Sequence, residues 1–261
     1  MTSAPLLGAA IGDALAMPIA GLSHQNVRLF YRGIKGYTAD EKRGGAAGTG
    51  TEITARLLAL ASAVPRAAFD EIRAPADETA GAAATAAALA RCDDNEASVW
   101  LARLTPRGPA RAAAHVQHRT LQRLSHTSPE TFDTDAFWET LRWDTHAAEG
   151  AFGSDGRLAA RLDALTGHLH LFPLDLQDLC NGTGDAPDEA WPFALAMFAR
   201  GPQLVEATLL SAINVGGAAH VVGALVGSLL GALHGAQPRP PSAWFAHPRR
   251  AEVVGRLGAG A

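Results

Sequence analysis

The sequence has few of the residues on which disulfide-bonded, zinc-stabilised or nucleic-acid-binding proteins depend. It contains two cysteines, Cys92 and Cys180, which form no C-x-x-C pair and predict neither a disulfide framework nor a structural zinc site. Charged residues make up only 18% of the chain and the net charge is −4, which argues against a nucleic-acid or anionic-membrane partner. No basic segment precedes the first apolar residues, so we expect no secretory signal and a cytoplasmic protein.

Aromatic residues are also scarce, at 6%, and we find no stretch with the alternating pattern of a β-strand. Hydrophobic residues still make up 48% of the chain, and much of this share is alanine, which favours helix and close helix–helix contact. We therefore predict an all-α fold in a single domain over residues 1–261. Residues 238–261 would form a Pro-rich link and a short basic C-terminal tail of that domain.

The segment Ala212–Ala236 contains no Asp, Glu, Lys or Arg, and it has a glycine at every fourth position from Gly223 to Gly235. Residues four apart share one helix face, so this helix presents a ridge without side chains to a close neighbour. Pairs of transmembrane helices have a similar pattern, but the pair Gly216-Gly217 breaks the apolar run. The run that remains is too short to cross a membrane. We expect a buried helix that packs against another small-residue helix at Gly8 and Gly12.

Proline, glycine and apolar spacing divide the rest of the chain into helices and loops. Ala110–Leu124 reads as an amphipathic helix, with Val116 and Leu121 inward and His118 outward. Asp40–Gly50 reads as a loop, and 67–78 as a short helix or loop. We expect further helices over Leu6–Met17, His24–Tyr31, the segment from Thr51 to Pro65, Ala80–Arg91, Ala97–Leu104, Asp135–Trp143, Leu158–His168, Leu174–Cys180, Ala190–Phe198 and Gln203–Asn214.

Few side chains stand out as chemical groups. Asp13 is a lone carboxylate in an apolar helix, where it is either a cap for a neighbouring helix or a site residue. His168 and His170 lack a third ligand nearby, so we interpret them as surface residues. The glycine-rich segments 44–50 and 216–217 each precede a helix, where backbone amides bind phosphate well, but neither fits a P-loop or a dinucleotide fingerprint.

Four segments together resemble the ADP-ribosylglycohydrolase family, which includes the dinitrogenase-reductase-activating glycohydrolases. Gly8–Pro18 resembles its G-x-x-x-G-D-A-L-G-x-P opening, and Gly48–Glu52 stands where the family has T-D-D-T. Pro192–Leu195 resembles its P-x-A-L segment, and Ala212–Gly217 with the glycine helix resembles A-V-N-L-G-G-D-T-D-T. The resemblance implies an all-α fold whose cleft holds two Mg²⁺ ions and cleaves the glycosidic bond between ADP-ribose and an acceptor.

The acidic ligands that this resemblance implies are missing. The T-D-D-T position reads Gly48, Thr49, Gly50, Thr51, and the D-T-D-T position reads Ala218, Ala219, His220, Val221. Ala20 replaces the acid that often follows the proline of the first helix. Mg²⁺ requires hard oxygen ligands, so we predict no metal site and no Mg²⁺ cofactor here.

The resemblance leaves a set of candidate residues for a metal-free cleft. Candidates for acid–base roles are Asp13, Glu52 and His220. Candidates for ligand binding are Thr49, Gly50, Thr51, Asn214, Gly216 and Gly217. The residues favour a pseudoenzyme or a divergent cleft that binds ADP-ribose, a related nucleotide or a protein partner. The alternatives are a residual or altered ADP-ribosyl hydrolase and a regulatory subunit, and we expect neither a nucleic acid nor a membrane as partner.

Overall fold

The computed structural model describes residues 4–39, 46–63 and 79–235. The predicted tail at 238–261, the first part of the predicted loop Asp40–Gly50 and the predicted element at 67–78 lie outside the described residues. Within those ranges the chain is helical and has no strand; its one β-type contact is an isolated antiparallel bridge between Ser23 and Gly216. The predicted all-α fold is confirmed.

The described residues form a succession of helices. In chain order they are α1 (Ala4–Ala16), the 3₁₀ turn η1 (Met17–Ile19), α2 (His24–Tyr31), α3 (Glu52–Ala63), α4 (Gly81–Ala84), α5 (Ala86–Leu89), α6 (Asp94–Leu104), α7 (Pro109–Ser125), η2 (Pro129–Thr131), α8 (Thr134–Phe152), α9 (Arg157–Leu165), α10 (Pro173–Leu179), α11 (Pro187–Arg200), α12 (Val205–Ile213) and α13 (Ala219–His234). In the part of the chain that the structure describes, no helix combines the length and the apolar character that a membrane crossing requires.

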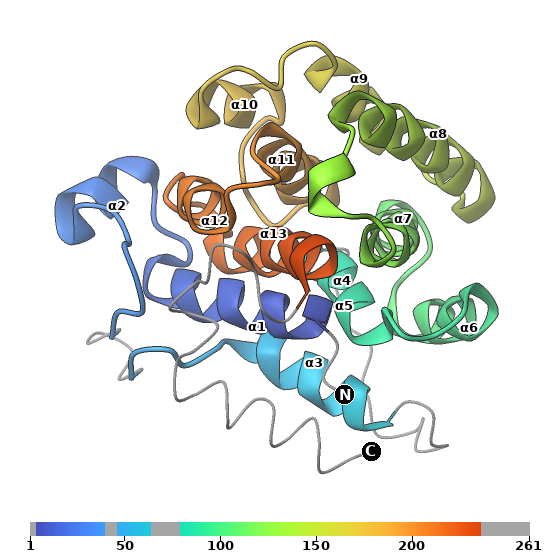
Figure 1. Cartoon of the computed structure of the whole chain (residues 1–261), viewed down its shortest axis with the longest axis horizontal. Coiled ribbons are helices and arrows are strands. Elements are labelled where there is room, and N and C mark those ends of the chain that lie inside the picture. The colour runs from blue at the N-terminus through green and yellow to red at the C-terminus, as the bar shows by residue number, and fades with distance from the viewer. Residues whose placement is uncertain (1–3, 40–45, 64–78, 236–261) are drawn as a thin grey trace.

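The first and last helices, α1 and α13, lie side by side in the middle of the molecule (Figure 1). Their glycines face each other, so the two backbones are in direct contact. A Cβ atom added at Gly12 would lie 1.8 Å from the Gly223 carbonyl oxygen, and one at Gly227 would lie 2.1 Å from the Gly8 carbonyl oxygen. Any side chain at these positions would force the helices apart, which confirms the predicted pairing of the two glycine faces.

The other helices surround this pair and supply the larger side chains of the core. Trp191 of α11 is fully buried, and its indole Nε1 donates a hydrogen bond to Gln117 of α7 at 3.1 Å. The Gln117 amide in turn donates to the Ser228 hydroxyl of α13 at 3.2 Å. This chain of polar contacts ties α7, α11 and α13 together and satisfies groups that would otherwise be costly to bury.

Three predictions of local detail are wrong. The expected helix Asp135–Trp143 continues to Phe152 as α8 and ends at Gly153, which has a φ of 71°. The expected helix Ala80–Arg91 is divided into α4 and α5 at Thr85, whose hydroxyl donates to the Ala82 carbonyl oxygen at 2.6 Å and competes with the helical backbone pattern. His118 does not point outward. It is buried beneath α5, where its Nε2 lies 3.1 Å from the Leu89 carbonyl oxygen.

Candidate functional site

Three elements converge where α1 ends: the end of α1 itself, the start of α3 and the start of α13. Asp13, near the end of α1, is fully buried and points at the first turn of α3. It accepts hydrogen bonds from the Thr51 backbone N–H at 2.7 Å and the Thr51 hydroxyl at 2.7 Å. It also accepts from the Thr54 N–H at 3.2 Å and the Thr54 hydroxyl at 2.6 Å.

Through these four contacts Asp13, a residue of α1, caps the start of α3. A helix start leaves backbone N–H groups without partners, and a carboxylate satisfies them well. Burial raises the pKa of the Asp13 carboxyl, while the hydrogen bonds from Thr54 and Thr51 and the nearby His220 act to lower it. The carboxyl group is thus engaged by protein donors.

His220 and Glu52 face each other across the same corner. His220 Nε2 lies 4.0 Å from a Glu52 carboxylate oxygen. The Glu52 side chain is 73% exposed and the His220 side chain 20% exposed. The other imidazole nitrogen, Nδ1, is buried and has no hydrogen-bond partner among the described residues. The structure therefore brings the three predicted acid–base candidates together, but only His220 and Glu52 have nitrogen or oxygen atoms left for a ligand.

The predicted ligand-binding turn before α13 is engaged in holding the fold. The Asn214 side chain accepts from the Ile34 N–H at 2.6 Å and donates to the Ile34 carbonyl oxygen at 3.0 Å. Gly216 and Gly217 adopt φ values of 91° and 68°, which side chains rarely tolerate. These contacts fix the direction in which α13 begins.

Thr183, which is not among the predicted site residues, also belongs to this corner. Its carbonyl oxygen accepts from the Ala218 N–H at 2.6 Å, and its hydroxyl donates to the Gly216 carbonyl oxygen at 3.1 Å. A Cβ added at Gly217 would lie 2.3 Å from the Thr183 carbonyl oxygen, which explains why glycine is required there. No local pattern marks Thr183 as part of the corner, because Gly216 and Ala218 are more than 30 residues away along the chain.

The residues at the corner do not fit two Mg²⁺ ions. Gly50 and Ala218 offer no side-chain oxygen, and His220 is a ligand better suited to zinc. A Cβ added at Gly50 would lie 2.5 Å from the Thr54 hydroxyl and 3.0 Å from an Asp13 oxygen, so the space for a side chain is filled. Among the described residues, no group of three or more His, Cys, Asp or Glu side chains could hold a metal ion.

The remaining predicted residues, Thr49 and Thr51, lie on the loop that leads into α3. The Thr49 N–H donates to the Ala46 carbonyl oxygen at 3.0 Å, which closes a turn. The Thr51 hydroxyl, besides contacting Asp13, accepts from the Ile53 N–H at 3.2 Å. Thr51 therefore helps Asp13 to cap the start of α3.

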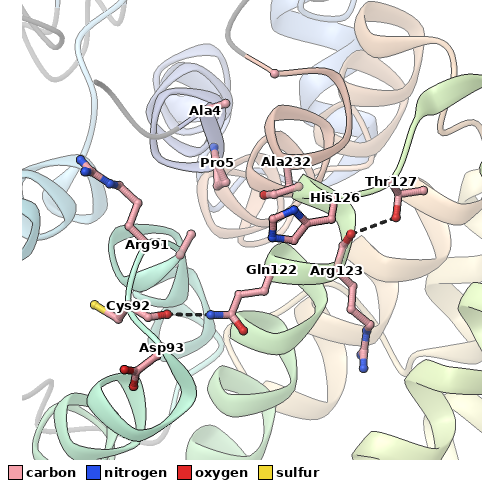
Figure 2. Close-up of a pocket in the computed structure, with 13 residues that line it drawn as sticks. Ala4, Pro5, Arg91, Cys92, Asp93, Gln122, Arg123, His126, Thr127 and Ala232 are labelled. Atoms are coloured by element: carbon pink, nitrogen blue, oxygen red, sulfur yellow. Dashed lines mark hydrogen bonds between the residues drawn. The ribbon is translucent and has the colours of Figure 1, made fainter.

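A cavity of about 1110 Å³ lies at the other end of the α1–α13 pair (Figure 2). Ala4 and Pro5 of α1, Ala232 of α13 and polar side chains that include Arg91 and His126 line it. At a helical rise of about 1.5 Å per residue, Ala232 is roughly 18 Å along α13 from His220. None of the predicted site residues lines this cavity, so it is distinct from the corner at Asp13.

Comparison with known proteins identifies the relatives of the chain. The sequence profile of the ADP-ribosylglycohydrolase family matches residues 70–257. A solved structure described as an ADP-ribosylglycohydrolase-related protein complex is similar, with a TM-score of 0.66 and 21% sequence identity, over 98% of this chain and 95% of that chain. At this identity the likeness is evidence of a shared fold. A search of curated protein sequences finds no match.

Proposed function

Because this chain belongs to the ADP-ribosylglycohydrolase family, we propose that it is a pseudoenzyme that binds ADP-ribose or a related nucleotide without Mg²⁺. The observation that carries the proposal is the absence of acidic side chains at residues 49, 50, 218 and 220. Asp13 is the acid of the family motifs that this chain keeps, and it is buried and bonded to Thr51 and Thr54. The carboxylates that would hold two cations and orient a water are replaced by groups that cannot do so.

The start of α13 supports binding of the negatively charged part of such a ligand. The N-cap residue, Ala218, has no side chain that could cap the first turn. The free N–H groups at a helix start carry partial positive charge and attract phosphate. His220 adds an unpartnered Nδ1 at the same turn, and the absence of the family's acids at residues 49, 50, 218 and 220 reduces the repulsion that a phosphate would meet without a metal. Thr49, Gly50 and Thr51 would contact the ligand from the α3 side.

An altered hydrolase is the alternative, and one distance favours it. His220 and Glu52 are 4.0 Å apart, so a small movement would let them share a proton as an acid–base pair. Such an enzyme would release ADP-ribose without a metal, which separates it from the pseudoenzyme.

The cellular location that we propose is the cytoplasm. Both cysteines, Cys92 and Cys180, are free and buried. Burial raises the pKa of each thiol to about 12. Unpaired thiols of this kind suit a reducing compartment.

Calorimetry with ADP-ribose, in the presence of Mg²⁺ and then of EDTA, tests the proposal. We expect the same affinity in both conditions, and a loss of at least about tenfold in His220→Ala. His126→Ala is the matched control, since His126 lines the distant cavity of Figure 2, and it should bind like the wild type. Binding that requires Mg²⁺ would contradict the loss of the metal site.

An activity assay decides between the pseudoenzyme and the alternative. We expect no release of ADP-ribose from arginine- or serine-modified peptides in either Mg²⁺ or EDTA. Release that persists in EDTA and disappears in Glu52→Gln would establish the altered hydrolase. Release that needs Mg²⁺ would contradict both readings.

A further inference from the structure

Helix α2, His24–Tyr31, lies at the periphery of the molecule (Figure 1). Of its residues only Val27 is buried. Leu29, which points away from Val27 on the helical wheel, is 72% exposed, and Phe30 beside it is 59% exposed. Two adjacent large apolar side chains that are each more than half exposed are a feature that monomeric surfaces usually avoid and that binding sites use.

Helix α2 is fixed to the rest of the protein at both ends. At its start, Ser23 forms the bridge to Gly216, and His24 Nδ1 lies 2.9 Å from the Asn214 carbonyl oxygen. Just after its end, Ile34 is bonded to the Asn214 side chain through both its N–H and its carbonyl oxygen. A fixed helix loses little conformational entropy when a partner binds to it.

The segment that contains α2 has a charge opposite in sign to that of the whole protein. Residues 14–39 include three basic residues and no Asp or Glu, and acidic residues resume at Asp40 and Glu41, although the whole chain has 26 acidic residues and a net charge of −4. Arg28 and Arg32 flank the apolar pair, Lys35 follows, and all three are exposed. The surface formed by Arg28, Leu29, Phe30, Arg32 and Lys35, which we call the α2 surface, is thus apolar at its centre and basic at its edge.

We propose that the α2 surface is a docking site for an acidic segment of a partner protein that also presents apolar side chains. Leu29 and Phe30 would be covered by the apolar residues, and the arginines would pair with carboxylates, which they bind through two parallel hydrogen bonds. A membrane fits less well, because α2 has only eight residues, is pinned at both ends and belongs to a protein of net negative charge.

This surface lies next to the proposed nucleotide site, because Asn214 and Gly216 connect α2 to the start of α13. Docking does not depend on nucleotide binding, however. A chain that binds no ADP-ribose would still carry the α2 surface, so the two proposals fail separately.

Fluorescence anisotropy with a labelled probe peptide tests the apolar part of the site. The probe is a helical peptide with leucine at every third or fourth position and glutamate at every charged position. We expect saturable binding to the wild type, weakened at least about tenfold by Leu29→Ser combined with Phe30→Ser. Trp143→Ser is the matched control, since Trp143 is also 72% exposed but lies on α8. Thermal melts of each variant should lie close to that of the wild type, because each of these side chains is more than half exposed.

The basic edge is tested by charge reversal. Arg28→Glu combined with Arg32→Glu should weaken the same peptide at least about tenfold, whereas Arg103→Glu combined with Arg107→Glu, on another exposed face, should not. A peptide with glutamine in place of glutamate should bind at least about tenfold more weakly than the acidic one.

Several results would overturn the proposal. These are no saturable binding of the acidic peptide, equal loss in the control variants, and equal binding of the glutamine peptide. Cosedimentation with phosphatidylserine vesicles that the Leu29→Ser and Phe30→Ser changes abolish, without peptide binding, would assign the surface to a membrane. A concentration-dependent dimer abolished by the same changes would assign it to a second copy of this chain.

Discussion

The exchange of Asp13 for alanine or asparagine separates a capping role from a catalytic one. Alanine removes the acceptor of all four hydrogen bonds from Thr51 and Thr54. The two hydroxyls can turn to other partners, but the two backbone N–H groups cannot. A buried donor left without a partner costs about 1–3 kcal/mol, so the change should destabilise the protein by roughly 2–6 kcal/mol.

Asparagine should behave very differently at the same position. Its amide oxygen can occupy the place of Asp13 Oδ2, which accepts three of the four bonds. Its amide nitrogen would face the Thr51 hydroxyl, which can reverse and accept. We therefore expect Asp13→Asn to cost less than about 1.5 kcal/mol, the net value of a single hydrogen bond.

Urea denaturation followed by circular dichroism measures both changes, and calorimetry with ADP-ribose accompanies it. The capping role predicts a large loss of stability for Asp13→Ala and nearly unchanged stability and binding for Asp13→Asn. The reasoning would be refuted by an Asp13→Ala protein as stable as the wild type. A stable Asp13→Asn protein that loses ligand binding or an activity would instead place Asp13 in the site.

Three further predictions concern the packing and charge of the core. Gly227→Ala should lower the melting temperature by at least several degrees, because the new Cβ would meet the Gly8 carbonyl oxygen. Gly150 lies on α8 with open space around it, so Gly150→Ala should stabilise the protein by about 0.5–1 kcal/mol. The Thr120 hydroxyl is buried with no partner among the described residues, so its replacement by valine should raise the free energy of unfolding by about 1 kcal/mol in urea melts, and a decrease would show a hydrogen bond. Burial lowers the pKa of His118 from 6.5 to about 4, so on acidification the unfolded chain binds this proton before the folded protein does. The free energy of unfolding should therefore be unaffected by His118 above pH 6.5 and should fall by about 3 kcal/mol as the pH drops from there through 4. His118→Gln should remove this pH dependence.

The sequence by itself determined the class of the fold and its central contact. Alanine-rich segments between prolines and glycines specify helices through local backbone preference, and the four-residue spacing of Gly223 and Gly227 marks the face that meets Gly8 and Gly12. The sequence by itself also shows that the acidic metal ligands of the family are missing from the site. The identities of residues 49, 50, 218 and 220 are visible without a structure, because a missing carboxylate needs no coordinates to be recognised.

Only the tertiary structure decided what the remaining groups do. Asp13 is a lone acid on a helix in the sequence, and its role depends on Thr51 and Thr54, about 40 residues away. His118 has the spacing of a surface residue, yet α5 covers it. Local patterns fix which helices form, but hydrogen bonds between distant segments fix which polar groups remain available for a ligand. At this corner those bonds engage Asp13 and Asn214 and leave His220 and Glu52.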